Sequence, residues 1–258
     1  MNEVTQKTAA GLPAASMFED DASQGLGNIS QQDLALPFLK ILGQLSPEVN
    51  KRDGKHVEGA EPGMIFNSVT GDLYDGVKGI DVIPAFYKLE YVEWKDRGEG
   101  PGAPVMVHDS SSDIMAQTKP DANYKDRLPS GNYIEPTHYH YVVVVDENDQ
   151  PSETAVIVMK ATQAKKSKKW NSMMLSQRRK GKNGMFQPPT WSQIYLMKTM
   201  LEKNNLGSWF GWEVEHHKDI PNQDLMDTAM SFYETCKQGN TKVNLSQEGE
   251  PQVTSAPF

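Results

Sequence analysis

The sequence predicts a mainly β protein with few helices, built as a small antiparallel barrel of the oligonucleotide-binding (OB) type with a helix between hairpins. Residues 79–94, 138–145 and 153–159 are rich in β-branched and aromatic side chains, which is typical of strands. A basic, amphipathic stretch at 162–177 separates them from another strand-rich stretch at 191–212. Five or six strands with a helix before the last pair match such a barrel.

The first part of the chain contains little regular structure before its first hairpin. Residues 1–30 are rich in Ala, Gly, Ser, Gln and acidic residues without periodicity, so we expect a disordered acidic segment. The apolar run 33–42 predicts a short helix with Pro37 in its first turn. Residues 64–69 and 73–74 flank a Thr-Gly-Asp turn and predict a hairpin.

The middle of the chain combines strands with one long connection. Pro84 interrupts the long strand and marks either a sheet edge or a bulge. Residues 96–132 are rich in Gly, Pro, Ser and Asp, which predicts a long, mobile loop. The turn sequence DENDQP at 146–151 joins the strands on either side of it into a hairpin.

The basic stretch is predicted to be helical because side chains that can pack recur at i, i+3, i+4 and i+7, namely Trp170, Met173, Met174 and Gln177. Residues 191–196 and 208–212 then predict a second hairpin, with a helix over 192–203 as the alternative. Residues 222–236 form an amphipathic helix. The polar residues 237–258 predict a flexible tail.

The 258 residues therefore predict a single domain at 31–236 between two flexible ends. The one cysteine, Cys236, excludes an internal disulfide and a cysteine-rich zinc site. No apolar run approaches the roughly 18 residues needed to cross a bilayer. The N-terminus lacks the features of a signal peptide. We expect a cytoplasmic protein with no membrane partner.

No metal site and no cofactor are predicted from the histidines. His138 and His140 share a strand face, as metal ligands do. No other His or Cys lies close to them in sequence, which favours a structural or surface role. His216 and His217 would lie on opposite faces of a strand, which does not suit chelation.

Charge is strongly segregated along this chain, whose net charge is −8. No acidic residue occurs between Glu153 and Glu202, and the rest of the chain carries 16 basic residues against 34 acidic ones, a net charge of −18. This pattern indicates local binding of a polyanion. The alternative, a solvated helix face, normally mixes both signs. The cations in this stretch are Lys160, Lys165, Lys166, Lys168, Lys169, Arg178, Arg179, Lys180, Lys182 and Lys198.

We expect all of these cations except Lys198 to hold phosphates, with residues 178–184 as a flexible basic loop. Aromatic side chains on the strands could stack on unpaired bases. The alternative is that they fill the core, as Tyr139, Tyr141 and Trp212 also could. The candidates for DNA contact are Tyr87, Tyr91, Trp94 and Trp209 as stacking residues, and Trp170 within the basic helix.

An enzymatic alternative depends on Asp81, Glu93 and Lys95. Metal-dependent nucleases use two carboxylates to bind Mg²⁺ and a lysine near the attacking water. This spacing is common by chance. The sequence contains neither a phosphate-binding Gly-rich loop ending in Gly-Lys-Ser/Thr nor a serine nucleophile elbow. We therefore expect a non-enzymatic protein and keep the nuclease as a third alternative.

Several motifs together carry a resemblance over residues 34–212: KKSKKW and RRKGK in the basic stretch, NNLGSWFGW after it, and the terminal SAPF. With these motifs the chain resembles a single-stranded DNA-binding protein of a tailed bacteriophage. The resemblance implies an OB barrel without catalytic activity. It also implies sequence-independent coating of single-stranded DNA during phage replication, recombination or repair, in the host cytoplasm.

The tail carries a second resemblance. Bacterial single-stranded DNA-binding proteins end in a run of acids followed by Pro-Phe, which recruits replication and repair enzymes and competes with DNA for the groove. Pro257 and Phe258 match that tip, and we expect them to bind replication or recombination proteins. This tail departs from that pattern, because only Glu248 and Glu250 supply acids, and the resemblance therefore does not extend to strong competition between tail and DNA.

Three questions stay open from the sequence alone. Stacking and phosphate contacts suit RNA as well as DNA. The oligomeric state is not determined, and a homo-oligomer is one option. A virion or host-takeover interaction protein, whose basic patch meets an acidic protein surface, is the second functional class.

Overall fold

The computed structural model describes residues 35–96, 98–99, 102–205, 207–239 and 241, all within one compact unit, Ala35–Phe258. The predicted disordered segment at 1–30 lies outside the described residues, as does the tail from 242 onward. None of the helices in the described part of the chain is long and apolar enough to span a membrane.

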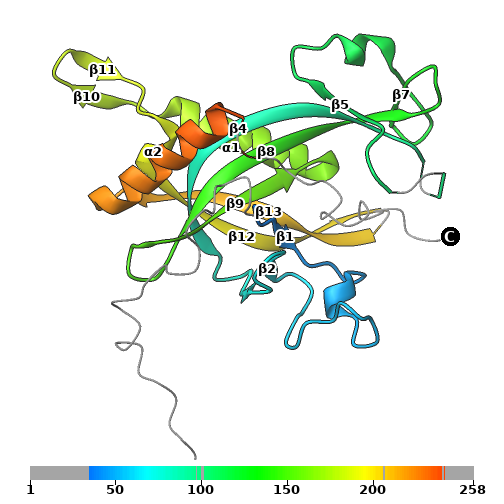
Figure 1. Ribbon diagram of the computed structural model, residues 1–258, viewed down its shortest axis with the longest axis horizontal. Helices are drawn as coiled ribbons and strands as arrows, with labels where there is room; N and C mark the ends of the chain where they lie inside the picture. The colour runs from blue at the N-terminus through cyan, green and yellow to red at the C-terminus, as the bar shows by residue number, and fades with distance from the viewer. Residues whose placement is uncertain (1–34, 97, 100–101, 206, 240, 242–258) are drawn as a thin grey trace, which may run out of the picture. The chain divides into compact units, whose positions relative to one another are not determined.

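The molecule is mainly β, and two long antiparallel strands, β4 and β8, form its centre (Figure 1). At one end of this pair, β12 and β13 continue the sheet from β4, and β9 continues it from β8. At the other end, β5 pairs with β4, and β7 and β6 follow β8. The strands of this sheet are β4 (Ile80–Trp94), β5 (Met106–Asp109), β6 (Lys119–Pro120), β7 (Asp126–Arg127), β8 (Tyr133–Val145), β9 (Pro151–Met159), β12 (Gln193–Asn204) and β13 (Gly207–Asp219).

Two smaller sheets complete the β structure of the described residues. The first has the order β1-β2-β3 and adjoins the main sheet, because Phe38 forms a parallel bridge with Val156 of β9. The second is the β10–β11 hairpin, which follows the basic helix. Their strands are β1 (Leu39–Ile41), β2 (Ile65–Asn67), β3 (Leu73–Tyr74), β10 (Arg179–Gly181) and β11 (Gly184–Phe186). Short 3₁₀ helices occur at Pro47–Val49, Ile114–Gln117, Ala161–Gln163 and Thr190–Ser192.

Two α-helices cover opposite faces of the curled sheet. Helix α1 (Ala164–Ser176) packs with one face through Trp170, in the same core as Val142 and Val144. Helix α2 (Gln223–Lys237) packs on the other face, in the same core as Val143 and Val145. The run VVVV in β8 is uninterrupted because the side chains on both faces of the strand are buried, which removes the usual alternation with polar residues.

Most predicted elements are confirmed. The strand at 79–94, the hairpin of β8 and β9, the hairpin of β2 and β3, and both helices form as expected. Pro84 lies at a register shift between β4 and β8, so of the two predicted alternatives it marks a bulge. The bulge changes the alternation of β4: Ala85 and Phe86 both belong to the core under α2.

Two predicted elements were wrong. The run 33–42 is not helical where it is described, because Leu39–Ile41 pairs with β2. Residues 96–132 contain β5, β6, β7 and a 3₁₀ helix instead of a loop without structure. Arg127 bridges Asp96 and Asp121 in this segment, which ties its two ends together. These pairings join residues distant in sequence, so local composition could not reveal them.

Two further predictions need correction. The stretch at 178–184 forms most of the β10–β11 hairpin rather than a flexible loop. The last hairpin forms, but its register differs: Asn204 pairs with Gly207, so Trp212 lies opposite Thr199 and the strands are longer than predicted. The alternative helix at 192–203 is wrong, because its residues bury Tyr195 and Met197 in the sheet core.

Candidate nucleic-acid interface

Helix α1 divides its side chains between the core and the solvent. Ser167, Trp170 and Met174 are buried, and their spacing of three and four places them on one side. On the other side, Lys165, Lys168 and Lys169 are exposed. The 3.6-residue period therefore turns a lysine-rich sequence into a helix with a packed side and a cationic side.

Buried contacts fix α1 on the sheet. His140 Nε2 shares a hydrogen bond of 2.8 Å with Ser167 Oγ. The imidazole ring of His140 stacks on Trp170, with 4.4 Å between ring centroids. Burial lowers the pKa of His140 to about 3, with a smaller contribution from His138, so the ring is neutral at neutral pH. A neutral ring suits both contacts, because a buried charge here would have no acidic partner.

Tyrosines of β4 border one side of α1. The hydroxyl of Tyr87 lies 2.8 Å from His138 Nδ1. Burial raises the pKa of Tyr87, and hydrogen bonds that Asn171 and Ser167 donate to its hydroxyl oxygen partly oppose that increase. Burial, and secondarily the charge of Lys168, lowers the pKa of His138. Lys168 is thus close to the tyrosine side of α1.

Tyr91 extends this side along β4. It is four residues beyond Tyr87 on the same strand, so the two rings share a sheet face. Both side chains are only partly buried. The exposed lysines of α1 therefore lie next to aromatic surface that is accessible to solvent.

Trp209 borders the opposite side of α1. Its Nε1 donates to Glu202 Oε2 at 3.0 Å, and Lys166 Nζ lies 2.7 Å from Glu202 Oε1. The backbone N–H of Trp212 donates to Gln163 Oε1 at 2.8 Å, just before α1 begins. Trp209 is partly exposed. Aromatic side chains therefore lie on both sides of the cationic helix.

The β10–β11 hairpin carries the second group of cations away from α1 (Figure 1). Lys180 and Lys182 are exposed. Arg178 donates to the carbonyl oxygens of Leu175 and Gln177, where a cation stabilises the C-terminus of the helix. The basic stretch of the sequence is therefore two separate surfaces in the structure.

Four of the cations have acidic partners. Lys166 pairs with Glu202, Arg179 with Asp219 and Lys198 with Glu215. Lys160 lies 3.6 Å from Glu135 and above the ring of Trp94. By strand alternation, Glu135 and Trp94 lie on the sheet face opposite His138 and Tyr87, so Lys160 does not belong to the α1 surface. Within the described ranges, the cations without an ion pair are Lys165, Lys168, Lys169, Arg178, Lys180 and Lys182.

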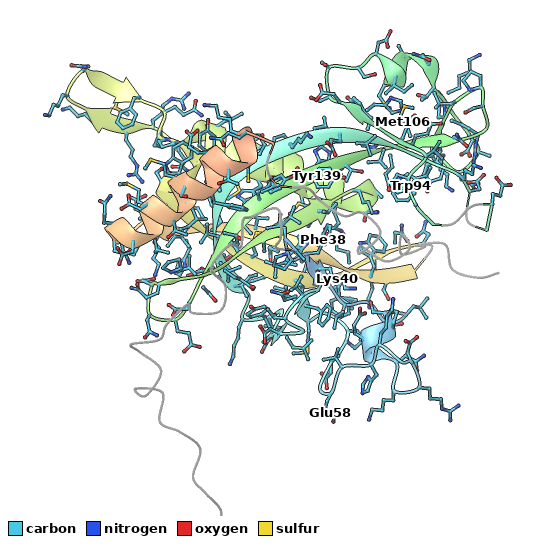
Figure 2. The ribbon with its side chains drawn as sticks, in the orientation of Figure 1. Phe38, Lys40, Glu58, Trp94, Met106 and Tyr139 are labelled. Atoms are coloured by element: carbon cyan, nitrogen blue, oxygen red, sulfur yellow. The ribbon has the colours of Figure 1, made fainter. Side chains whose placement is uncertain are left out.

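Burial removes two of the predicted DNA-contacting aromatics. Trp170 has no exposed surface, and Trp94 is 7% exposed. Trp94 lies with Met106 at the β5 end of the sheet, where these strands pair (Figure 2). Neither indole is available to stack on a base, and both are corrected to core residues. Tyr139, Tyr141 and Trp212 are buried as well, so they are core residues, as the alternative interpretation of the aromatics predicted.

The residues of the nuclease alternative do not come together. Asp81 lies 2.8 Å from His217 Nδ1 at the start of β4. Glu93 lies 3.1 Å from His108 Nε2 at its end. Twelve residues of strand separate the two carboxylates by about 40 Å. Among the described residues, no group of three or more His, Cys, Asp or Glu could hold a metal ion.

Sequence reasoning missed three residues that connect the site, Ser167, Asn171 and Glu202, whereas it had favoured a structural or surface role for His140. Ser167 had a detectable signal, since it lies three residues before Trp170 on the packed side of the helix. A buried serine there requires a hydrogen-bond partner from another element. The other two gave no signal, because their roles depend on contacts between strands and helix. Pro257 and Phe258 lie outside the described residues.

Comparison with known proteins identifies the family. A family profile described as Pam3 phage gp34-like protein matches residues 5–242. Comparisons with curated proteins and with solved structures gave no significant match. The matched range includes every strand and helix described above, so the similarity is not confined to the basic stretch. The chain therefore belongs to the Pam3 phage gp34-like protein family.

Proposed function

We propose that this protein binds single-stranded DNA without sequence preference and coats it during phage replication, recombination or repair, in the host cytoplasm. It performs no catalytic step and needs no cofactor. The observation that carries the proposal is the solvent-facing side of α1, where Lys165, Lys168 and Lys169 have no ion pair within the described chain and lie between partly exposed aromatics. Phosphate contacts and base stacking are the two interactions that such binding needs.

The proposed path of the strand follows α1. The lysines would contact successive phosphates, while Tyr91 on one side and Trp209 on the other offer rings to unpaired bases. Lys180 and Lys182 would extend the cationic surface beyond the helix. A curled antiparallel sheet with a helix before its last hairpin supports the proposal that the fold is a variant of the OB barrel.

A titration of the protein with a dT oligonucleotide tests the proposal, with tryptophan fluorescence as the signal. If the six unpaired cations each contact a phosphate, the slope of log affinity against log salt is about −4. Double-stranded DNA of equal length should bind more weakly, because its bases cannot stack on protein rings. An RNA oligonucleotide in parallel decides between the two nucleic acids. A flat salt response contradicts the proposal.

A control variant separates this site from general positive charge. Lys51, Arg52 and Lys55 are exposed cations in a distant loop. Changing all three to alanine removes as much charge as the variant Lys165→Ala/Lys168→Ala/Lys169→Ala on α1 does. We expect the control to keep its affinity for dT within a factor of about two. Equal losses in the two variants would show that the protein has no localised site.

The second candidate is a phage interaction or virion protein that binds an acidic protein surface. The exposed Met185 and Phe186 of the hairpin favour it, since apolar side chains beside cations suit a protein partner. A gel shift with dT distinguishes this candidate from the first. Recruitment of replication or recombination proteins by Pro257 and Phe258 remains a prediction, tested by deleting both residues.

A further inference from the structure

The β10–β11 hairpin exposes apolar and cationic side chains together. Met185 is 66% exposed and Phe186 is 47% exposed. Met185 lies opposite Lys180 across the hairpin, so their side chains share a face, and Lys182 follows in the turn. An isolated two-stranded hairpin is only marginally stable in water. Exposed apolar residues on such an element indicate a contact that the single chain does not supply.

The solvent-facing side of α2 has the complementary composition. Met226 is 37% exposed and Met230 is 44% exposed, one helical turn apart. The exposed acids of this helix are Asp224, Asp227 and Glu234, and Lys237 is an exposed cation in its last turn. The structure records no ion pair for these three acids with any of the residues it describes. This side of α2 therefore offers methionines and negative charge to match the methionine, phenylalanine and lysines of the hairpin.

A hollow of about 370 Å³ connects the two surfaces on one molecule. Arg179 at the base of the hairpin and Met226 on α2 both line it, with an apolar wall formed by Pro189, Trp191, Ile220 and Pro221. Arg179 is already paired with Asp219, and Ser192, Asn222 and Gln223 complete the lining, so the hollow combines an apolar wall with a polar edge where α2 begins. Its size suits an apolar side chain from outside.

We infer that two copies of this chain associate around a two-fold axis, with the hairpin of each copy lying across α2 of the other. Lys180 and Lys182 then face the acids of α2. Met185, which shares a hairpin face with Lys180, covers the methionines and enters the hollow, while Phe186 points from the other face of the hairpin. Because both surfaces belong to one molecule and adjoin each other, the same contact forms twice, as a two-fold interface requires.

A second copy explains more of these observations than a nucleic acid does. A DNA strand would neutralise the lysines, and a base could stack on Phe186. The same strand would be repelled by the acids of α2, and the two methionines would stay exposed. A partner that carries an acidic, methionine-bearing surface and a basic, apolar surface can cover the hairpin and α2 at once. A second copy of this chain is such a partner. The inference does not depend on DNA binding by α1. It does take Lys180 and Lys182 out of the proposed path of the strand, which leaves four unpaired cations for phosphates and a salt slope of about −3.

Paired charge reversals test the interface by molar mass, measured by light scattering without nucleic acid. We expect the wild-type protein to have twice its chain mass of 28.8 kDa. Lys180→Glu/Lys182→Glu should be monomeric, because two acidic surfaces meet. Asp224→Lys/Asp227→Lys should be monomeric for the opposite reason. An equal mixture of the two variants should recover the doubled mass, since every hairpin then meets an α2 of opposite charge.

Lys51→Glu/Lys55→Glu serves as the matched control. It changes the net charge by the same amount in a distant loop, so this variant should remain dimeric. Thermal melting checks that each variant folds. A monomeric wild type at all concentrations, a mixture that stays monomeric, or a mass above that of the dimer overturns the two-fold interface. A hairpin variant that keeps the wild-type mass but loses affinity for a short dT oligonucleotide also overturns it, because the hairpin would then contact nucleic acid.

Discussion

Helices α1 and α2 cover opposite faces of one sheet. Comparing them shows which of their side chains serve packing and which are available for binding. Each buries a stripe of apolar side chains, with Trp170 and Met174 in α1 and Leu225 and Phe232 in α2. Their solvent-facing sides carry opposite charge: lysines on α1, and mostly acids on α2. The buried stripe determines where each helix lies. The exposed side, which contributes little to stability, determines what each helix attracts.

The largest expected effect comes from the buried stripe of α1. Trp170→Ala removes an indole with no exposed surface, stacked on His140 and in edge contact with Tyr195. We expect the free energy of unfolding to fall by about 3–5 kcal/mol in urea denaturation. Leu175→Ala, on the exposed side of the same helix, should change it by less than about 0.5 kcal/mol. Equal effects would mean that α1 does not pack as described.

Acid should weaken the packing of α1 more than that of α2. The pKa of His140 is lowered from 6.5 to about 3 in the folded state, so below pH 6.5 the unfolded chain binds a proton that the folded chain does not. The stabilisation is therefore complete above pH 6.5 and is lost as pH falls toward 3. Between pH 7 and pH 4.5 we expect a loss of about 2–3 kcal/mol. His140→Gln should remove this component of the pH dependence, and an unchanged profile in that variant contradicts the assignment.

Charge on the two exposed sides should affect DNA affinity in opposite directions. Lys165→Ala/Lys168→Ala/Lys169→Ala removes three of the six unpaired cations, so the salt slope should fall from about −4 to about −2. Affinity at low salt should fall about 10- to 100-fold, and unfolding should hardly change. Asp227→Ala/Glu234→Ala on α2 should leave affinity unchanged or raise it slightly. A larger loss of affinity from the α2 variant than from the α1 variant would contradict the proposal, because it would place the nucleic acid on α2.

The smallest effect concerns the rings that border α1. Trp209→Ala and Tyr91→Ala should each weaken binding of a dT oligonucleotide by about 1 kcal/mol, since one stacked base is lost. Tyr91→Phe should bind like the wild type, because the ring is kept and only the hydroxyl is removed. If Tyr91→Phe loses as much as Tyr91→Ala, the hydroxyl rather than the ring makes the contact.

The candidate site was predictable from the sequence only in part. The exposed lysines of α1 follow from helical periodicity, and Trp209 from its place on a strand. Trp170 was assigned to DNA although the same periodicity places it on the packed side. Lys160 belongs to the same basic stretch, but it is not part of the α1 surface, because it contacts Glu135 and Trp94 on the other face of the sheet. Charge counted along a chain does not include acids that the fold brings near.

By itself, the sequence determined the long strands, both helices and the turn that joins β8 to β9. These features depend on periodicity and turn residues within a few positions of one another. Only the tertiary structure decided that Leu39–Ile41 is a strand, that residues 96–132 extend the sheet, and that the basic stretch separates into a helix face and a hairpin. Each of those outcomes depends on pairing between segments far apart in the chain, and that pairing leaves no local pattern.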